Sequence, residues 1–140
     1  MAVVPGYEVK KKKNYAAVRA WGKDVSTVFE QSALGLFSVL TDTSAVNPAR
    51  ERRIDIVMGS REELLSEWLE MLVNLHEIKR VFYSKFKVTV KGDRLEATVR
   101  GERIDPRRHE SLDEIISVME KGLEIGKAEE GWEANFRLET

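Results

Sequence analysis

The sequence has no cysteine, three prolines and a single glutamine. The lack of cysteine excludes disulfides, zinc–thiolate sites and thiol nucleophiles, and it favours a reducing compartment. No apolar run reaches the length of a membrane span, and the first residues lack the basic and apolar regions of a signal peptide. We therefore expect a cytoplasmic protein that does not act at a membrane.

An excess of charge of one sign is also missing. The 23 basic and 24 acidic residues leave a net charge of −1, so no global field draws the chain to nucleic acid, and we expect no direct nucleic-acid contact. An alternative remains open, in which RNA contacts the lysine run Lys10–Lys13 and the pair Arg107 and Arg108. Abundant Lys and Glu with little Gln is typical of heat-adapted proteins.

Motifs for catalysis are absent too. The sequence contains no Ser/His/Asp set, P-loop, glycine-rich phosphate fingerprint or paired-histidine metal motif. The two histidines are His76, at the end of a predicted helix, and His109, in a predicted polar loop. A histidine at a helix end usually packs or offsets the helix dipole. We therefore predict that the chain is not an enzyme.

The hydrophobic pattern predicts one α+β domain over residues 1–140, with two helices packed on a largely antiparallel or mixed β-sheet. Alternation predicts a strand from Tyr7 and strands over residues 16–22 and 53–58. It also predicts a hairpin with its turn at Gly92 and a last strand from Trp132 to the C-terminus. Helical spacing predicts helices over residues 25–42, after an Asp24 cap, and from Ser60 to about His76, with a capping box at the start of the second. Residues 113–126 suit a helix and a buried strand equally well.

These segments together resemble the archease family, small proteins that assist the RNA-splicing ligase in its guanylylation and turnover. The resemblance begins with a strand and glycine turn at Arg19–Gly22, followed by a helix at Phe29–Asp42. It continues in the helix Glu62–Leu69 and in the loop Gly101–Asp105 with His109. It implies an archease-like fold, a protein partner that is an RNA-splicing ligase, and a role in tRNA splicing. It also implies that residues 114–125 form a strand.

The chain differs from the family at the positions of the family's functional residues. Archeases carry a cation-binding aspartate at the end of the first strand, where this chain has Ala17. A functional lysine and a histidine of the later strand are replaced by Ile116 and Lys121. The family's terminal Asp and hydrophobic residue are replaced by Glu139 and Thr140. We therefore predict a surface for a protein partner at Ala17, Ile116, Lys121, Glu139 and Thr140.

A carboxylate missing from a site for a divalent cation leaves a gap in a shell of about six to eight oxygens, so we predict no metal site and no cofactor. The remaining acidic candidates are Asp42, Glu139 and the Thr140 carboxylate, and in a further hypothesis the Lys121 ammonium replaces the cation beside the last two. One alternative keeps ligase activation through these acids. Another is a small-anion binder or an enzyme that uses a remodelled cleft around Tyr15, Ala17, Met119 and Lys121.

Overall fold

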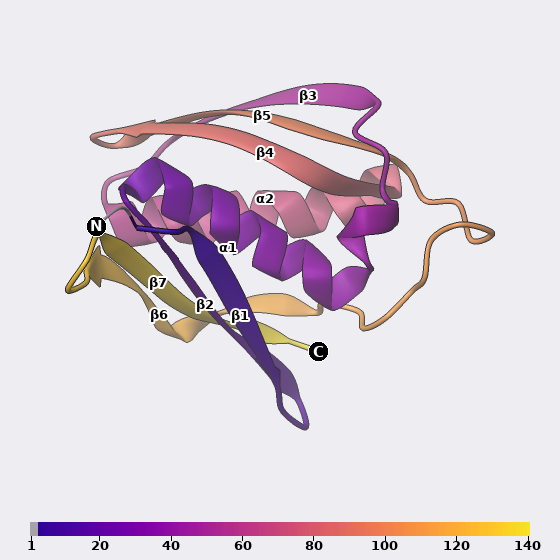
Figure 1. The fold of residues 1–140 in the computed structure, drawn as a ribbon, viewed down its shortest axis with the longest axis horizontal. Helices are drawn as coiled ribbons and strands as arrows, with labels where there is room; N and C mark the ends of the chain where they lie inside the picture. The colour runs from indigo at the N-terminus through magenta and orange to yellow at the C-terminus, as the bar shows by residue number, and fades with distance from the viewer. Residues whose placement is uncertain (1–2) are drawn as a thin grey trace.

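A computed structural model describes residues 3–140, and in it two helices lie between two antiparallel β-sheets (Figure 1). The four-stranded sheet, which we call sheet A, has the order β1-β2-β7-β6, and the three-stranded sheet, sheet B, has the order β3-β5-β4. The strands of sheet A are β1 (Gly6–Lys11), β2 (Tyr15–Gly22), β6 (Ser117–Lys127) and β7 (Trp132–Glu139). Those of sheet B are β3 (Arg50–Val57), β4 (Val81–Lys91) and β5 (Arg94–Arg103).

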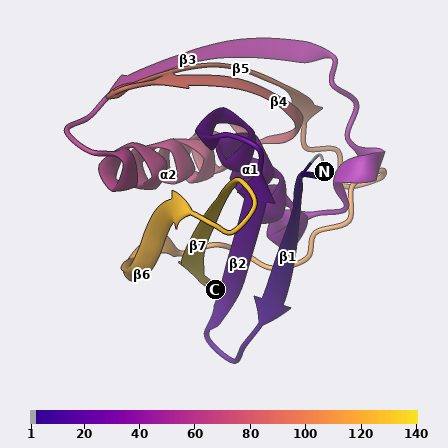
Figure 2. The ribbon, with the colours of Figure 1, turned by 60° about the vertical axis from the view of Figure 1, so that its left-hand side comes forward.

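The helices α1 (Val25–Leu40) and α2 (Arg61–Lys79) fill the space between the sheets (Figure 2). Helix α1 packs on β2 of sheet A and on β4 of sheet B, whereas α2 contacts β6 on one side and β3, β4 and β5 on the other. Each sheet therefore buries one face and leaves the other to solvent, which explains the alternation of apolar and polar residues along most strands. Neither helix has an apolar stretch that would cross a bilayer, as far as residues 3–140 are concerned.

Both helices begin at the caps that the sequence predicts. The Asp24 carboxylate accepts a hydrogen bond from the Thr27 amide at 2.8 Å, and the Ser60 hydroxyl accepts one from the Glu63 amide at 3.1 Å. Each cap satisfies one of the amides that the first helical turn leaves without a partner. The end of α2 is an Arg80 cap with a φ of 55°, in the left-handed region.

Helix α1 lies very close to β2 because Gly35 has no side chain. A Cβ at this position would approach Val18 Cγ1 to 2.7 Å and Tyr7 Cδ2 to 3.5 Å. The same helix also closes the outer edge of sheet B. Glu30 and Ser26 of α1 accept hydrogen bonds from the amides of Val88 and Val90 in β4, at 2.8 and 2.9 Å. Edge amides that are paired in this way cannot template the addition of another strand.

The loop between β5 and β6 is fixed by a network around Glu102. The Glu102 carboxylate accepts hydrogen bonds from the Asn47 amide at 2.6 Å, from His109 Nε2 at 3.0 Å and from the Arg108 guanidinium. His109 Nδ1 in turn accepts from the Asp105 amide at 2.8 Å. His109 lies in this loop, as expected, but the residue is only 4% exposed and its ring packs edge-on against Phe82.

The α+β class with two helices is confirmed, and the structure refines the predicted sheet. All strand pairs of residues 3–140 are antiparallel, and they divide between two sheets that enclose the helices, where the sequence predicted one sheet. The ambiguous segment contains strand β6, which begins at Ser117, three residues later than the resemblance implied. His76 packs as expected, with its ring stacked on Phe82 and its Nδ1 donating to the Val81 carbonyl at 2.9 Å.

Candidate functional site

Four of the five residues predicted to bind a partner lie close together on sheet A. Thr140 follows β7, and its amide donates to the Asn14 carbonyl at 3.1 Å, just before β2. The amide of Ile116, just before β6, donates to the Glu139 carbonyl at 2.7 Å. Ala17 lies two residues after Tyr15 in β2, opposite Arg137 of β7. The antiparallel pairing of β2, β7 and β6 thus brings Ala17, Ile116, Glu139 and Thr140 together at one end of the sheet, which we call the sheet A end.

Lys121 is the fifth predicted residue, and it lies farther along β6. The register between β6 and β7 shifts between Met119 and Glu124, so Lys121 falls in an irregular part of the strand where its side chain is exposed. The Glu139 carboxylate instead accepts a hydrogen bond from the Ser117 hydroxyl at 2.8 Å. Within residues 3–140, Lys121 makes no ion pair shorter than 4.0 Å with Glu139 or with the Thr140 carboxylate, which argues against Lys121 as a replacement for a cation.

The outward face of sheet A also carries the groups of the predicted remodelled cleft. Tyr15 lies opposite Glu139, and the next outward row places Ala17, Arg137 and Met119 side by side on β2, β7 and β6. The Arg137 guanidinium lies 5.2 Å from the centre of the Tyr15 ring, within the range of a cation–π contact. Arg137, which the sequence did not single out, therefore stands at the centre of this face.

Asp42 has a local structural task. Its carboxylate caps the short 3₁₀ helix η1 (Thr43–Ala45) by accepting from the Ser44 hydroxyl at 2.7 Å and from the Ser44 amide at 3.0 Å. The hydrogen bond from the hydroxyl, and to a smaller extent that from the amide, holds the pKa of Asp42 below its ordinary value. An aspartate in this position is engaged by its own loop.

The residues present do not fit a divalent cation. Across residues 3–140, no three side chains of His, Asp or Glu gather closely enough to hold a metal ion. Glu139 binds Ser117, Asp42 binds Ser44, and Ala17 offers no oxygen from its side chain. A hard cation such as calcium needs about six to eight oxygen ligands, and these residues supply a small part of such a shell.

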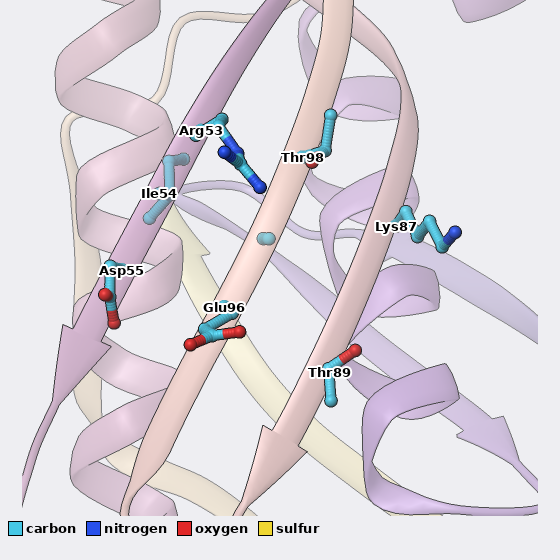
Figure 3. A pocket seen from close by; sticks show the side chains of 8 residues that line it. Arg53, Ile54, Asp55, Lys87, Thr89, Glu96 and Thr98 are labelled. Atoms are coloured by element: carbon cyan, nitrogen blue, oxygen red, sulfur yellow. The ribbon is translucent and has the colours of Figure 1, made fainter.

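The outer face of sheet B has a hollow that the sequence reasoning missed (Figure 3). Its volume is about 560 Å³, and the strand register brings Arg53 of β3, Thr98 of β5 and Lys87 of β4 into one row across it. The next row holds Asp55, whose carboxylate pairs with Arg94 at 2.7 Å, and Glu96. Alternation along each strand predicts that these side chains point outward, but only the register shows which of them are neighbours.

Comparison with known proteins gives one consistent result. The model of the Archease protein family (MTH1598/TM1083) matches residues 7–138. The protein archease of Methanothermobacter thermautotrophicus is 41% identical over 110 residues, which cover 76% of this chain and 78% of the relative. That of Thermococcus kodakarensis is 32% identical over 124 residues, 85% of this chain and 87% of the relative.

Two solved structures share the fold. The solution structure of Methanobacterium thermoautotrophicum protein 1598 superimposes with a TM-score of 0.78 at 35% identity and covers 96% of this chain and 99% of its own. The crystal structure of an archease from Thermotoga maritima, described as a possible chaperone, superimposes with a TM-score of 0.64 over 95% of this chain and 98% of its own. At 13% identity, this second similarity shows the fold alone.

Proposed function

The chain belongs to the archease family, and on that premise we propose that it is a non-catalytic accessory protein that binds a protein partner through the sheet A end. The partner that the family resemblance indicates is an RNA-splicing ligase, and the setting is tRNA splicing in the cytoplasm. In this proposal the protein acts by contact, without a bound divalent cation.

One observation carries the proposal, namely the exposed apolar group at the sheet A end. Ile116 is 66% exposed, although an isoleucine is among the residues that are most often buried. It lies where the last residues of β7 and the start of β2 meet, with Glu139 and Thr140 as polar neighbours. Apolar groups with polar surroundings are the usual arrangement of a protein interface, where the apolar group is buried on binding.

Loss of the metal site is the second part of the proposal. The side chains at the sheet A end include no group of three acidic or histidine ligands, and Glu139 already accepts from Ser117. A site of this composition favours contacts with neutral and charged groups of a partner over coordination of an ion. Arg137 supports the same conclusion, because a cation at the centre of the face would repel a divalent ion.

The test is a reconstitution with the ligase of the same organism. We expect the purified chain to increase guanylylation or multiple turnover of the ligase, and we expect Ile116→Asp to reduce that increase at least fivefold by placing a charge in the interface. Ile78→Asp is the matched control, because Ile78 is 74% exposed on α2 and lies outside the proposed surface. The control variant should keep the stimulation of the unchanged protein.

Two results would contradict the proposal. If the chain binds the ligase without stimulating it, the accessory role is wrong while the protein interface stands. If it stimulates the ligase and Ile116→Asp and Ile78→Asp behave alike, the accessory role stands and the sheet A end is the wrong surface.

A further inference from the structure

A second hollow lies on sheet B, at the end where α2 terminates. Its volume is about 290 Å³, and four cationic side chains line it: Arg50, Arg52, Lys79 and Arg103. Arg50 and Arg52 come from β3, Arg103 is the last residue of β5, and Lys79 is the last residue of α2. Residues from three elements that are far apart in the sequence thus face one small space.

The residue at the centre of the hollow is a glycine, Gly101, because the backbone of β4 lies against it too closely for any side chain. Register places Gly101 of β5 between Arg50 of β3 and Tyr83 of β4. Neighbouring strands are about 4.8 Å apart, so the backbones of Arg50 and Tyr83 stand about 10 Å apart with no side chain between them. Only glycine fits at position 101, because a Cβ there would collide with the Phe82 carbonyl oxygen, next to the bulge of β4.

The four cations have no carboxylate of their own. Over residues 3–140, none of them forms an ion pair shorter than 4.0 Å. The two acidic residues in the lining are already engaged elsewhere. Glu51 pairs with Arg100 at 2.8 Å, and Glu102 accepts from Arg108, His109 and the Asn47 amide. The hollow therefore keeps an excess of positive charge.

One group opposes an anion here, and its effect is small. The carboxyl end of α2 carries a partial negative charge of about half a unit. The Arg80 carbonyl, which follows the helix, accepts a hydrogen bond from the Ile104 amide at 2.8 Å, and Lys79 sits directly at the helix end. Four full positive charges outweigh this partial charge.

Tyr83 adds a polar group to the lining. Tyr83 lines the hollow and is only 4% exposed, with its ring fixed edge-on against Phe37 at 5.8 Å. Its hydroxyl has no hydrogen-bond partner among residues 3–140, and it is not sealed from solvent. A tyrosine hydroxyl that is unpaired and reached by solvent is available to donate to a group that enters the hollow.

We propose that this hollow binds a phosphate group. A phosphate matches the lining because guanidinium forks donate two parallel hydrogen bonds to its oxygens, a lysine adds a point charge, and a hydroxyl donates one further bond. The volume of about 290 Å³ accommodates one such group with its hydration. The inference is separate from the proposed ligase partner, since the hollow lies on sheet B whereas the proposed interface lies on sheet A, and it is tested on the protein alone.

The experiment is a titration of the ¹⁵N-labelled protein with sodium phosphate, against sodium chloride at the same ionic strength. We expect saturable shifts of the backbone amide signals of residues 50–52, 81–83 and 101–103. Arg103→Gln should weaken phosphate binding at least threefold, and Tyr83→Phe at least twofold while the buried ring stays in place. Lys87→Gln is the control, because it removes the same charge from the outer face of sheet B and should change binding less than twofold.

Other outcomes decide the matter. Shifts that chloride reproduces, or equal weakening by Arg103→Gln and Lys87→Gln, would overturn the site. A second arm uses a short single-stranded RNA as the probe. If the RNA shifts the same amides at lower concentration and competes with phosphate, a polynucleotide backbone presents the group; if only inorganic phosphate acts, the site serves a free phosphate.

Discussion

The carboxylate of Glu102 holds the β5–β6 loop to the body of the protein, and its charge should be measurable as stability. It accepts hydrogen bonds from the Asn47 amide at 2.6 Å, His109 Nε2 at 3.0 Å and the Arg108 guanidinium. These donors, with the Asn47 amide first, lower the pKa of Glu102 from 4.5 to about 2 in the folded protein. The Glu102 side chain is 15% exposed and that of Arg108 is 43% exposed, so solvent screens part of this interaction and the shift gives an upper bound on its contribution.

The direction and the size of the pH effect on stability follow from that pKa. A carboxyl whose pKa falls on folding stabilises the protein above its unfolded pKa, and the stabilisation is lost as the pH falls toward the folded pKa. At 1.36 kcal/mol per unit, the shift corresponds to at most about 3 kcal/mol at pH 7. About 2 kcal/mol of this should be gone at pH 3, midway through the window from 4.5 to about 2.

The variant Glu102→Gln tests this directly. Its amide oxygen can still accept from the Asn47 amide and from His109 Nε2, which share one oxygen of Glu102, but its NH₂ group then faces the Arg108 guanidinium, which is also a donor. We expect the free energy of unfolding, from urea titrations, to fall by about 2 to 3 kcal/mol at pH 7 and by less than about 1 kcal/mol at pH 3. Glu51→Gln is the control, because its ion pair with Arg100 is half exposed and should contribute less than about 1 kcal/mol.

An equal loss of stability at pH 7 and pH 3 would refute the reasoning, because the effect would then be one of shape and not of charge. A loss below about 0.5 kcal/mol at pH 7 would show that the donors do not discriminate the ionised carboxylate from an amide.

Three further predictions concern packing, burial and metal. Gly35→Ala should destabilise by about 1 to 3 kcal/mol in thermal unfolding, because its Cβ would lie 2.7 Å from Val18 Cγ1, while Gly126→Ala, with open space around it, should change little. Burial raises the pKa of Glu30, so its charge disfavours folding once the pH exceeds that pKa, and Glu30→Gln should leave the melting temperature equal or higher at pH 7. Calorimetric titration with calcium should give no saturable binding, and a site of micromolar affinity would disprove the loss of the metal site.

Much of the fold follows from periodicity, because helix caps and alternating strands are local properties. Asp24 and Ser60 begin their helices where the sequence predicts, and the turn at Gly92 joins β4 and β5 as expected. The division into two sheets was not predictable in this way. Alternation says which face of a strand is buried, but it does not say which strands share a sheet when both sheets bury one face against the same helices.

The site was predictable only in part, for the same reason. The resemblance named Ala17, Ile116, Glu139 and Thr140, and strand pairing brings them together. The phosphate hollow depends on an unpaired excess of charge on one side of a chain whose total charge is −1. Composition averages over all faces, so the lack of net charge concealed Arg50 and its neighbours, which only the register between β3 and β5 places around Gly101.

The positions at which the resemblance predicts a departure from the family share one physical property. Ile116 and Lys121 are exposed, and Ala17 lies on the outward face of β2. Substitutions at such positions usually change stability by about 0.5 kcal/mol or less. The groups that fix the fold are elsewhere, in the core between the sheets and in the contacts of Gly35 and Glu102. Substitutions at the sheet A end can therefore alter its chemistry while the core that fixes the fold stays intact.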